Sequence, residues 1–179
     1  MLITGALTGI GRAVAFAFAQ EGNRIVVSGR HDDAGEALVR ELRELGAEAE
    51  FIRADVRHEG DVRDLVDRAV ARFSRLDAAA NCAGTEGQPG PMTQQTADSY
   101  AATFDTNVLG TLLSMKHELR VMQAQRSGSI VNISSIYRRP MVTTAPAVHP
   151  SIPPASTRSR GSPDPRRSRS RPRAFVSMR

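Results

Sequence analysis

The chain has 179 residues, with 24 Lys plus Arg, 19 Asp plus Glu and a formal net charge of +5. Its single cysteine excludes an intrachain disulfide, and no apolar run reaches eighteen residues, so we expect one soluble cytoplasmic domain without membrane association. Residues 151–179 hold eight Arg and one Asp and leave residues 1–150 at −2, so the positive charge does not indicate a nucleic-acid-binding fold.

The chain opens with a short apolar strand, a glycine-spaced turn and a helix. Residues 1–3 are the strand, residues 4–11 (Thr-Gly-Ala-Leu-Thr-Gly-Ile-Gly) the turn, and residues 12–20 an Ala-rich helix. Glycines let backbone N–H groups approach a pyrophosphate, and the amino end of a helix supplies partial positive charge. This order favours a phosphate-binding turn. A Gly-rich connection without a ligand is the alternative that the glycines alone leave open.

Strands and helices alternate along the rest of the first 134 residues. Further strands are expected at 24–28, 50–53, 77–81 and 129–134. Helices are expected at 33–45, 62–73 and 99–125. In the last helix Asn107 interrupts the start, and one apolar stripe is expected, made of Leu112, Met115, Leu119 and Met122. The alternation predicts right-handed βαβ crossovers and a parallel sheet covered on both faces.

Several polar residues follow the ends of predicted strands. Arg30 follows the second strand, where a dinucleotide fold holds the adenosine ribose, and a cation there favours the 2′-phosphate of NADP over NAD. A solvated loop arginine is the alternative. Asp55 could meet the adenine amino group or cap the next helix. Residues 81–84 (Asn-Cys-Ala-Gly) are either a backbone wall for the cofactor or an ordinary tight turn, and Cys82 is expected to be a small buried side chain.

Together these segments resemble the short-chain dehydrogenase/reductase family. The matching segments, in family order, are residues 4–11, 55–56, 81–84, 107–110 and 129–135. The resemblance covers residues 1 to about 141 and implies an α/β fold, a Rossmann-type doubly wound parallel sheet. Residues 1–141 would be an incomplete dinucleotide-binding domain, truncated after the fifth strand, and residues 142–179 a disordered Pro/Arg/Ser-rich tail.

The resemblance also implies a site for NADP and a small carbonyl or alcohol substrate. Together with Arg30, the cofactor-binding residues would be Gly5, Gly9, Ile10, Gly11, Asp55, Val56, Asn81, Ala83 and Gly84. Ser135 would polarise the substrate carbonyl, and Asn107 would hold a water in the proton relay. Without the family, Ser135 would more often bond a backbone group, and Asn107 would be a polar residue that interrupts a helix. No metal site is expected.

The family's Tyr-x-x-x-Lys motif is absent where Ser135 predicts it. Val148 and Ile152 occupy those places, Tyr137 is too close to Ser135, and no Lys follows Lys116. Losing a positioned acid/base costs about 10² to 10⁴ in rate, so efficient turnover by this NADP-preferring oxidoreductase is not expected. A non-catalytic nucleotide- or partner-binding module and a non-functional product of a frameshift are the alternatives.

The basic segment 166–173 allows three interpretations. It could bind phosphate backbones, it could be a solvated charge run, or it could result from a reading-frame shift that replaced the family's remaining helices with Arg, Pro and Ser. The frameshift explains most, and nucleic-acid binding is the least favoured. Without those helices the fifth strand would be an exposed edge. A homo-oligomer, typical of the family, would then be in question.

Overall fold

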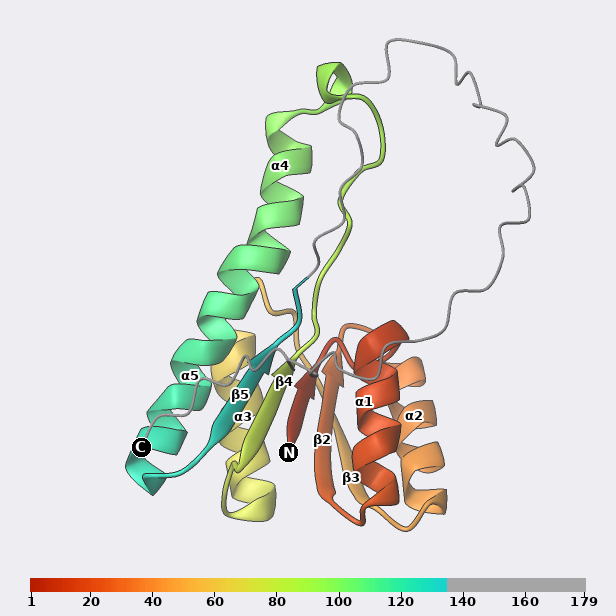
Figure 1. The fold of residues 1–179 in the computed structure, drawn as a ribbon, viewed down its shortest axis with the longest axis vertical. Helices are drawn as coiled ribbons and strands as arrows, with labels where there is room; N and C mark the ends of the chain where they lie inside the picture. The colour runs from red at the N-terminus through yellow and green to blue at the C-terminus, as the bar shows by residue number, and fades with distance from the viewer. Residues whose placement is uncertain (135–179) are drawn as a thin grey trace, which may run out of the picture. The chain divides into compact units, whose positions relative to one another are not determined.

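The computed structural model describes residues 1–134, which form an α/β fold around one five-stranded parallel sheet (Figure 1). The elements, in chain order, are β1 (Leu2–Thr4), α1 (Gly9–Gln20), β2 (Arg24–Gly29), α2 (Asp32–Glu44), β3 (Glu48–Arg53), α3 (Glu59–Phe73), β4 (Ala78–Asn81), η1 (Met92–Gln94), α4 (Ala97–Phe104), η2 (Asp105–Leu109), α5 (Gly110–Gln125) and β5 (Ser129–Asn132). The predicted alternation of strands and helices is confirmed. Ser135, the expected boundary at 141 and the basic segment lie outside the described residues.

The strands are ordered β3-β2-β1-β4-β5, and each neighbouring pair is parallel. The chain moves outward from β1 through β2 to β3, and then crosses back to add β4 and β5 on the other side of β1. The direction in which successive strands are added to the sheet therefore reverses between β1 and β4, while the strands themselves stay parallel. In doubly wound sheets the crevice at the carboxyl ends of such strands is where ligands bind. The predicted fold class thus determines where a site should be sought.

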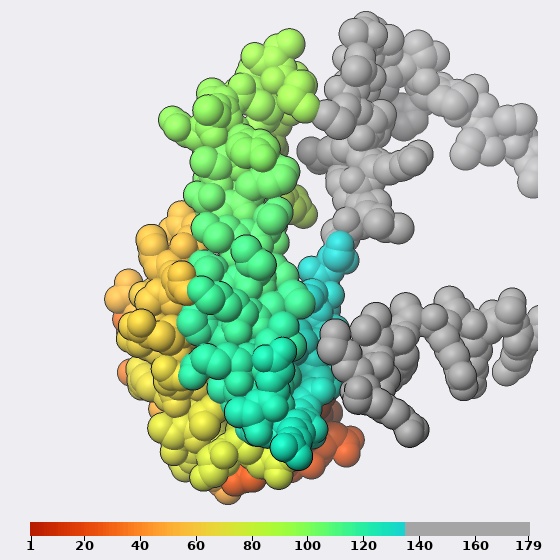
Figure 2. Space-filling model, turned by 90° about the vertical axis from the view of Figure 1, so that its left-hand side faces the viewer, coloured from red at the N-terminus to blue at the C-terminus, as the bar shows by residue number. Residues whose placement is uncertain are grey.

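Two apolar cores lie between the sheet and its helices. Consecutive residues of a strand point to opposite faces. Ile3 therefore joins Val27 and Leu38 under α1 and α2, whereas Leu2 joins Leu65 under α3 and α5. All five side chains are at most 2% exposed. Figure 2 shows the helices that cover the face of the sheet to which Leu2 points, with α5 packed beside α3. Both faces of the central strands are therefore covered, as predicted.

The helical region predicted over 99–125 is divided at Asn107, as expected. Helix α4 begins at a capping box formed by Thr96 and Ser99, and it leads into η2, a single π-helical turn that contains Asn107. Helix α5 continues from η2 without a break in direction (Figure 1). The interruption is therefore a local widening of the helix and not a loop.

The apolar stripe predicted for α5 is wrong. Leu112 is 61% exposed, and only Met122 of the four stripe residues is buried. A Cβ added to Gly110 would lie 2.6 Å from Cγ2 of Val56, so the side of α5 that carries Gly110 packs closely against Val56. The buried residues of α5 are Gly110, Leu113, Ser114, His117, Glu118 and Met122. Half of them are polar, which is why hydrophobic periodicity selected the wrong side.

Strand β5 is an edge of the sheet that residues 1–134 form, and the chain that follows it lies outside the described residues. Ile130 packs against the core under α3 and α5, whereas Val131 is 55% exposed and Ile133 is 42% exposed. These two residues alternate with Ile130, so they lie on the face that α1 and α2 cover farther along the sheet. Within residues 1–134 no helix is long and apolar enough to cross a membrane.

Candidate functional site

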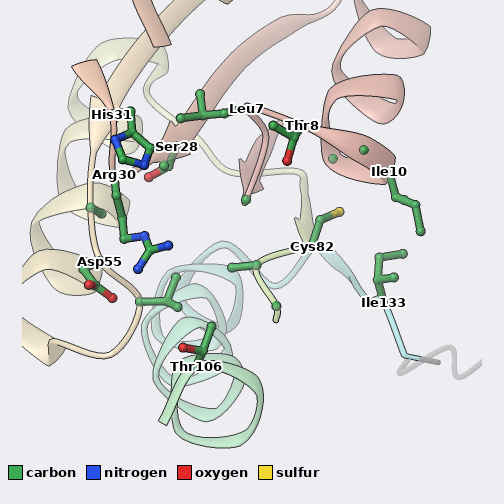
Figure 3. A pocket seen from close by; sticks show the side chains of 18 of the residues that line it. Leu7, Thr8, Ile10, Ser28, Arg30, His31, Asp55, Cys82, Thr106 and Ile133 are labelled. Carbon is green, nitrogen blue, oxygen red and sulfur yellow. The ribbon is translucent and has the colours of Figure 1, made fainter. Parts of the chain in front are cut away.

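A crevice of about 600 Å³ lies at the carboxyl ends of β1 to β4, where the strand order reverses. Figure 3 shows Arg30 and Asp55 toward one end of it and Cys82, Ile10 and Ile133 toward the other. The residues that line it are Gly5, Leu7, Thr8, Gly9, Ile10, Gly11, Ser28, Gly29, Arg30, His31, Ala54, Asp55, Val56, Cys82, Ala83, Gly84, Glu86, Thr106 and Ile133. Nine of the ten predicted cofactor residues are therefore brought together.

The glycine turn packs backbone to backbone against the turn after β4. Gly5 has φ +63°, and a Cβ there would lie 2.6 Å from the Cα and N of Ala83. A Cβ on Gly11 would lie 2.3 Å from the carbonyl oxygen of Gly5. No side chain fits at either position without moving the main chain. These glycines thus close the floor of the crevice between β1 and β4.

The amino end of α1 faces the crevice without a cap. The helix begins at Gly9, three residues before the predicted start, so the last two glycines of the motif belong to its first turn. Thr8 is the N-cap residue, but its side chain makes no capping hydrogen bond, and the first turn has no acidic residue. A Cβ on Gly9 would meet nothing within 4 Å. The unpaired N–H groups and open space fit an anionic group such as a pyrophosphate.

Arg30 follows β2 at the rim of the crevice. Its side chain is exposed and extends along the crevice wall beside Asp55 (Figure 3). It forms no ion pair with any residue of the described range. A guanidinium with free N–H donors at the end of β2 fits a phosphate group at this position.

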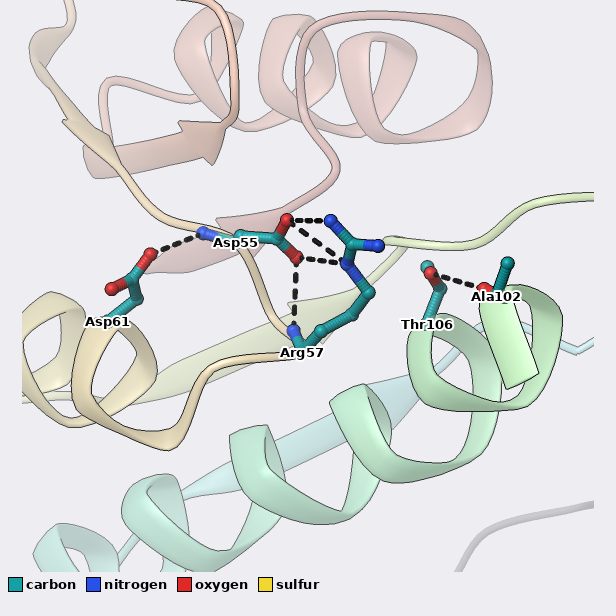
Figure 4. Close-up of polar contacts among 5 residues, drawn as sticks. All are labelled: Asp55, Arg57, Asp61, Ala102 and Thr106. Carbon is teal, nitrogen blue, oxygen red and sulfur yellow. Dashed lines mark hydrogen bonds and ion pairs between the residues drawn. The ribbon is translucent and has the colours of Figure 1, made fainter. Parts of the chain in front are cut away.

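Asp55 is held by Arg57 and does not cap α3. Both oxygens of its carboxylate accept from the Arg57 side chain, at 2.5 Å from Nη2 to Oδ2 and 3.0 Å from Nε to Oδ1 (Figure 4). These hydrogen bonds lower the pKa of Asp55 to about 2, although partial burial opposes the shift. The N-cap residue of α3 is His58, and the carboxylate of Asp61 accepts from the Asp55 N–H. The helix-cap interpretation of Asp55 is therefore wrong.

The turn after β4 meets the crevice through Cys82, Ala83 and Gly84, but not through Asn81. Asn81 is 5% exposed and lies inside the sheet. Cys82 is half-buried and points into the crevice, so the expectation of a simply buried side chain is corrected (Figure 3). Burial raises the pKa of its thiol. A thiol in this environment is predominantly protonated at neutral pH.

Asn81 is the centre of a buried polar network that the sequence did not reveal. Its amide Nδ2 donates to Glu118 Oε2 and to Asn132 Oδ1, each at 3.0 Å, and Thr4 Oγ1 donates to its Oδ1 at 3.3 Å. Glu118 is fully buried, and its Oε1 has no hydrogen-bond partner among the described residues. Burial raises the pKa of Glu118 to about 7. The network joins β1, β4, β5 and α5 just below the crevice.

Asn107 binds the main chain of Thr85. Its Oδ1 accepts from the Thr85 N–H and its Nδ2 donates to the Thr85 carbonyl, both at 2.8 Å. Its neighbour Thr106 lines the crevice and donates to the carbonyl of Ala102 (Figure 4). The amide of Asn107 therefore ties η2 to the loop after β4. Ser135, the other predicted catalytic residue, lies outside the described residues.

Sequence reasoning missed several residues of the site. Arg57 and Glu118 act through hydrogen bonds, and Ser28, His31 and Thr106 line the crevice. The detectable signal for Arg57 is its place two positions after a strand-end Asp, because an Asp side chain in a turn accepts from the backbone N–H two residues later. Groups of three or more side chains suited to a metal ion are absent from residues 1–134.

Comparisons with known proteins match most of the described chain. The family model for short chain dehydrogenase matches residues 1–147. Momilactone A synthase from Oryza sativa subsp. japonica is 40% identical over 137 residues, which cover 75% of this chain and 49% of the synthase. The chain spans about half the length of the curated relatives it matches.

Two solved structures show the same fold with a cofactor. An actinorhodin polyketide ketoreductase with NADPH is similar at a TM-score of 0.72 and 33% identity, over 75% of this chain and 53% of that chain. NAD⁺-bound xylitol dehydrogenase is similar at a TM-score of 0.71 and 35% identity, over 73% of this chain and 50% of that chain.

Proposed function

Because the chain belongs to the short-chain dehydrogenase family, we propose that its crevice binds a nicotinamide dinucleotide. The observation that carries this proposal is the uncapped amino end of α1, which faces a crevice floored by glycine backbone. Similar proteins solved with NADPH or with NAD⁺ support the class of cofactor. When bound, the nicotinamide would exchange a hydride with a small carbonyl or alcohol.

Each predicted residue is assigned a role within the proposed site. Gly5, Gly9, Ile10 and Gly11 would border the pyrophosphate, through backbone groups rather than side chains. The segment 55–56 would border the adenine. Ala83 and Gly84 would form the wall on the adenosine and nicotinamide-ribose side. Asn81 would support that wall from below, because its side chain points into the protein.

We assign the preference of this site to NADP over NAD, with Arg30 as the phosphate ligand. The guanidinium lies at the end of β2, exposed and free of an ion pair among the described residues. A charge-assisted hydrogen bond contributes about 1.5–3 kcal/mol, or roughly a ten- to hundredfold difference in affinity. Removing this charge should therefore lower the ratio of NADPH affinity to NADH affinity by the same factor.

The proposed reaction is reversible hydride transfer with impaired turnover. Ser135 would polarise the substrate carbonyl, and Asn107 would position a water while holding the main chain of Thr85. Val148 and Ile152 stand where the family's Tyr and Lys are expected, so the chain lacks the group that exchanges the proton. This substitution also favours a second candidate function, a dinucleotide-binding module without catalysis. We place the chain in the cytoplasm and propose no nucleic-acid partner.

A titration with NADPH, followed by nicotinamide fluorescence, tests binding. We expect saturable binding, and its absence up to about 1 mM would contradict the proposal. Arg30→Gln should weaken NADPH binding about tenfold or more and leave NADH binding unchanged. Arg63→Gln, on the exposed surface of α3, is the control for the loss of one positive charge.

Steady-state assays with carbonyl substrates separate the two candidate functions. We expect turnover well below about 1 s⁻¹, the lower end of the usual range for enzymes. Faster turnover would contradict the argument from the missing Tyr and Lys. NADPH binding without detectable turnover would favour the non-catalytic module.

A further inference from the structure

One arginine beside the crevice has no role in the proposed site. Arg57 lies in the turn after β3 and binds Asp55 through its Nε, its Nη2 and its own backbone N–H, which donates to Asp55 Oδ1 at 3.1 Å (Figure 4). The Asp55 side chain is 16% exposed and that of Arg57 is 36% exposed, so the ion pair lies at the protein surface, with its carboxylate the more enclosed partner. Both carboxylate oxygens are thus occupied by one cation. Arg57 itself does not line the crevice.

Arg30 lies close enough to Asp55 for their charges to interact. Both line the crevice, and the positive charge of Arg30 is among the causes that lower the pKa of Asp55, after the hydrogen bonds from Arg57. Asp105 also attracts Arg57, and Asp61 accepts from the Asp55 backbone N–H. These groups comprise three carboxylates and two guanidiniums, so removing Arg57 would leave Arg30 as their single positive charge.

We propose that Arg57 determines the cofactor preference indirectly, because it neutralises Asp55 and so leaves the charge of Arg30 available to a 2′-phosphate. This inference rests on the proposed function, which puts the adenosine end of the cofactor beside Arg30. Without Arg57, the Asp55 carboxylate would repel a phosphate and attract Arg30. It could also accept a hydrogen bond from a 2′-hydroxyl, which is the group that NAD carries there. Arg57 is therefore a positioning residue that acts through Asp55.

The test measures the Kd of the full chain for NADPH and for NADH by nicotinamide fluorescence. Arg57→Gln should weaken NADPH binding by at least about fivefold and change NADH binding by less than about twofold. Arg75→Gln is a matched control, because Arg75 pairs with Asp77 two residues later, with Nη2 2.5 Å from Oδ1. That pair lies before β4, at the opposite end of the strands. The control should leave both Kd values unchanged.

Two further variants separate charge from structure. The double variant Asp55→Asn/Arg57→Gln removes both charges, so its ratio of Kd values should return to that of the wild type. Arg57→Lys keeps the charge and should retain most of the preference. A purely structural role for Arg57 predicts instead that the double variant binds both cofactors weakly. If Arg57→Gln does not fold, as judged by circular dichroism, the other two variants decide between these outcomes.

The possible failures are distinguishable. If the wild type prefers NADPH and folded Arg57→Gln keeps the same ratio, the role of Arg57 is overturned while the NADP site stands. A wild type that binds both cofactors equally overturns the NADP preference together with the role of Arg57. A wild type that binds neither cofactor overturns the dinucleotide site as well.

Discussion

Glu118 should make the stability of this protein depend on pH between about 4.5 and 7. Its carboxyl is fully buried on α5, receives one neutral hydrogen bond from Asn81 and contacts no cation among the described residues. Desolvation therefore favours the protonated form and raises the pKa to about 7. In the unfolded chain the same group has its ordinary pKa of 4.5. The folded state thus binds the proton more tightly than the unfolded state.

The sign of the effect follows from this difference in proton binding. Between the two pKa values the folded state holds more protons, so the free energy of unfolding falls as the pH rises. Each unit of pKa difference corresponds to about 1.4 kcal/mol, so the full loss above pH 7 is on the order of 3 kcal/mol. Glu118→Gln keeps an acceptor for Asn81 and removes the titration. Relative to the wild type, this variant should gain about 3 kcal/mol between pH 4.5 and pH 8.

Urea unfolding followed by circular dichroism at several pH values measures this gain. The comparison uses the change with pH, so a constant cost of burying the Gln amide cancels. Glu44→Gln, at the exposed end of α2, is the control and should follow the wild type. If the free energy of unfolding changes with pH in the same way for Glu118→Gln and the wild type, Glu118 is not a buried carboxyl with a raised pKa.

Two further predictions test the crevice floor and the buried side of α5. Gly5→Ala should lower the free energy of unfolding by more than about 1 kcal/mol and weaken NADPH binding, because its Cβ would collide with Ala83. Gly22→Ala is the control: Gly22 has a similar φ of +71° but open space around it, so this variant shows the cost of backbone strain alone. Leu113→Ala should lower the free energy of unfolding, measured in urea, by about 2–5 kcal/mol, and Leu112→Ala should lower it by less than about 0.5 kcal/mol. Equal losses for the two variants would contradict the observed orientation of α5.

Much of the candidate site could be predicted because its determinants are local. The strand, glycine turn and helix of residues 1–20 are adjacent in sequence, and the turn needs backbone conformations that glycine adopts. Strand ends at residues 29, 53 and 81 then identify the loops that border the crevice, since all the strands run parallel. Composition and periodicity carry this information without reference to distant contacts.

Partners of individual side chains could not be predicted in the same way. Asp55 was equally compatible with adenine binding and helix capping, and the hydrogen bonds from Arg57 exclude the cap. Asn81 was expected at the cofactor, but its side chain turns inward to Glu118. Both outcomes depend on atoms brought within about 3 Å by folding, a scale on which hydrogen bonds are decided and which sequence spacing does not resolve.

The order of elements, the parallel sheet and the glycine turn could be predicted from the residues, because strand and helix periods and βαβ crossovers follow from local patterns. The orientation of α5 became known from the folded structure, in which Leu113, His117 and Glu118 are buried and Leu112 is exposed. That side of the helix includes Gly110, which packs closely against Val56, a residue 54 positions earlier in the chain. Packing between distant elements, and not hydrophobicity along the helix, therefore placed a buried carboxyl beneath the crevice.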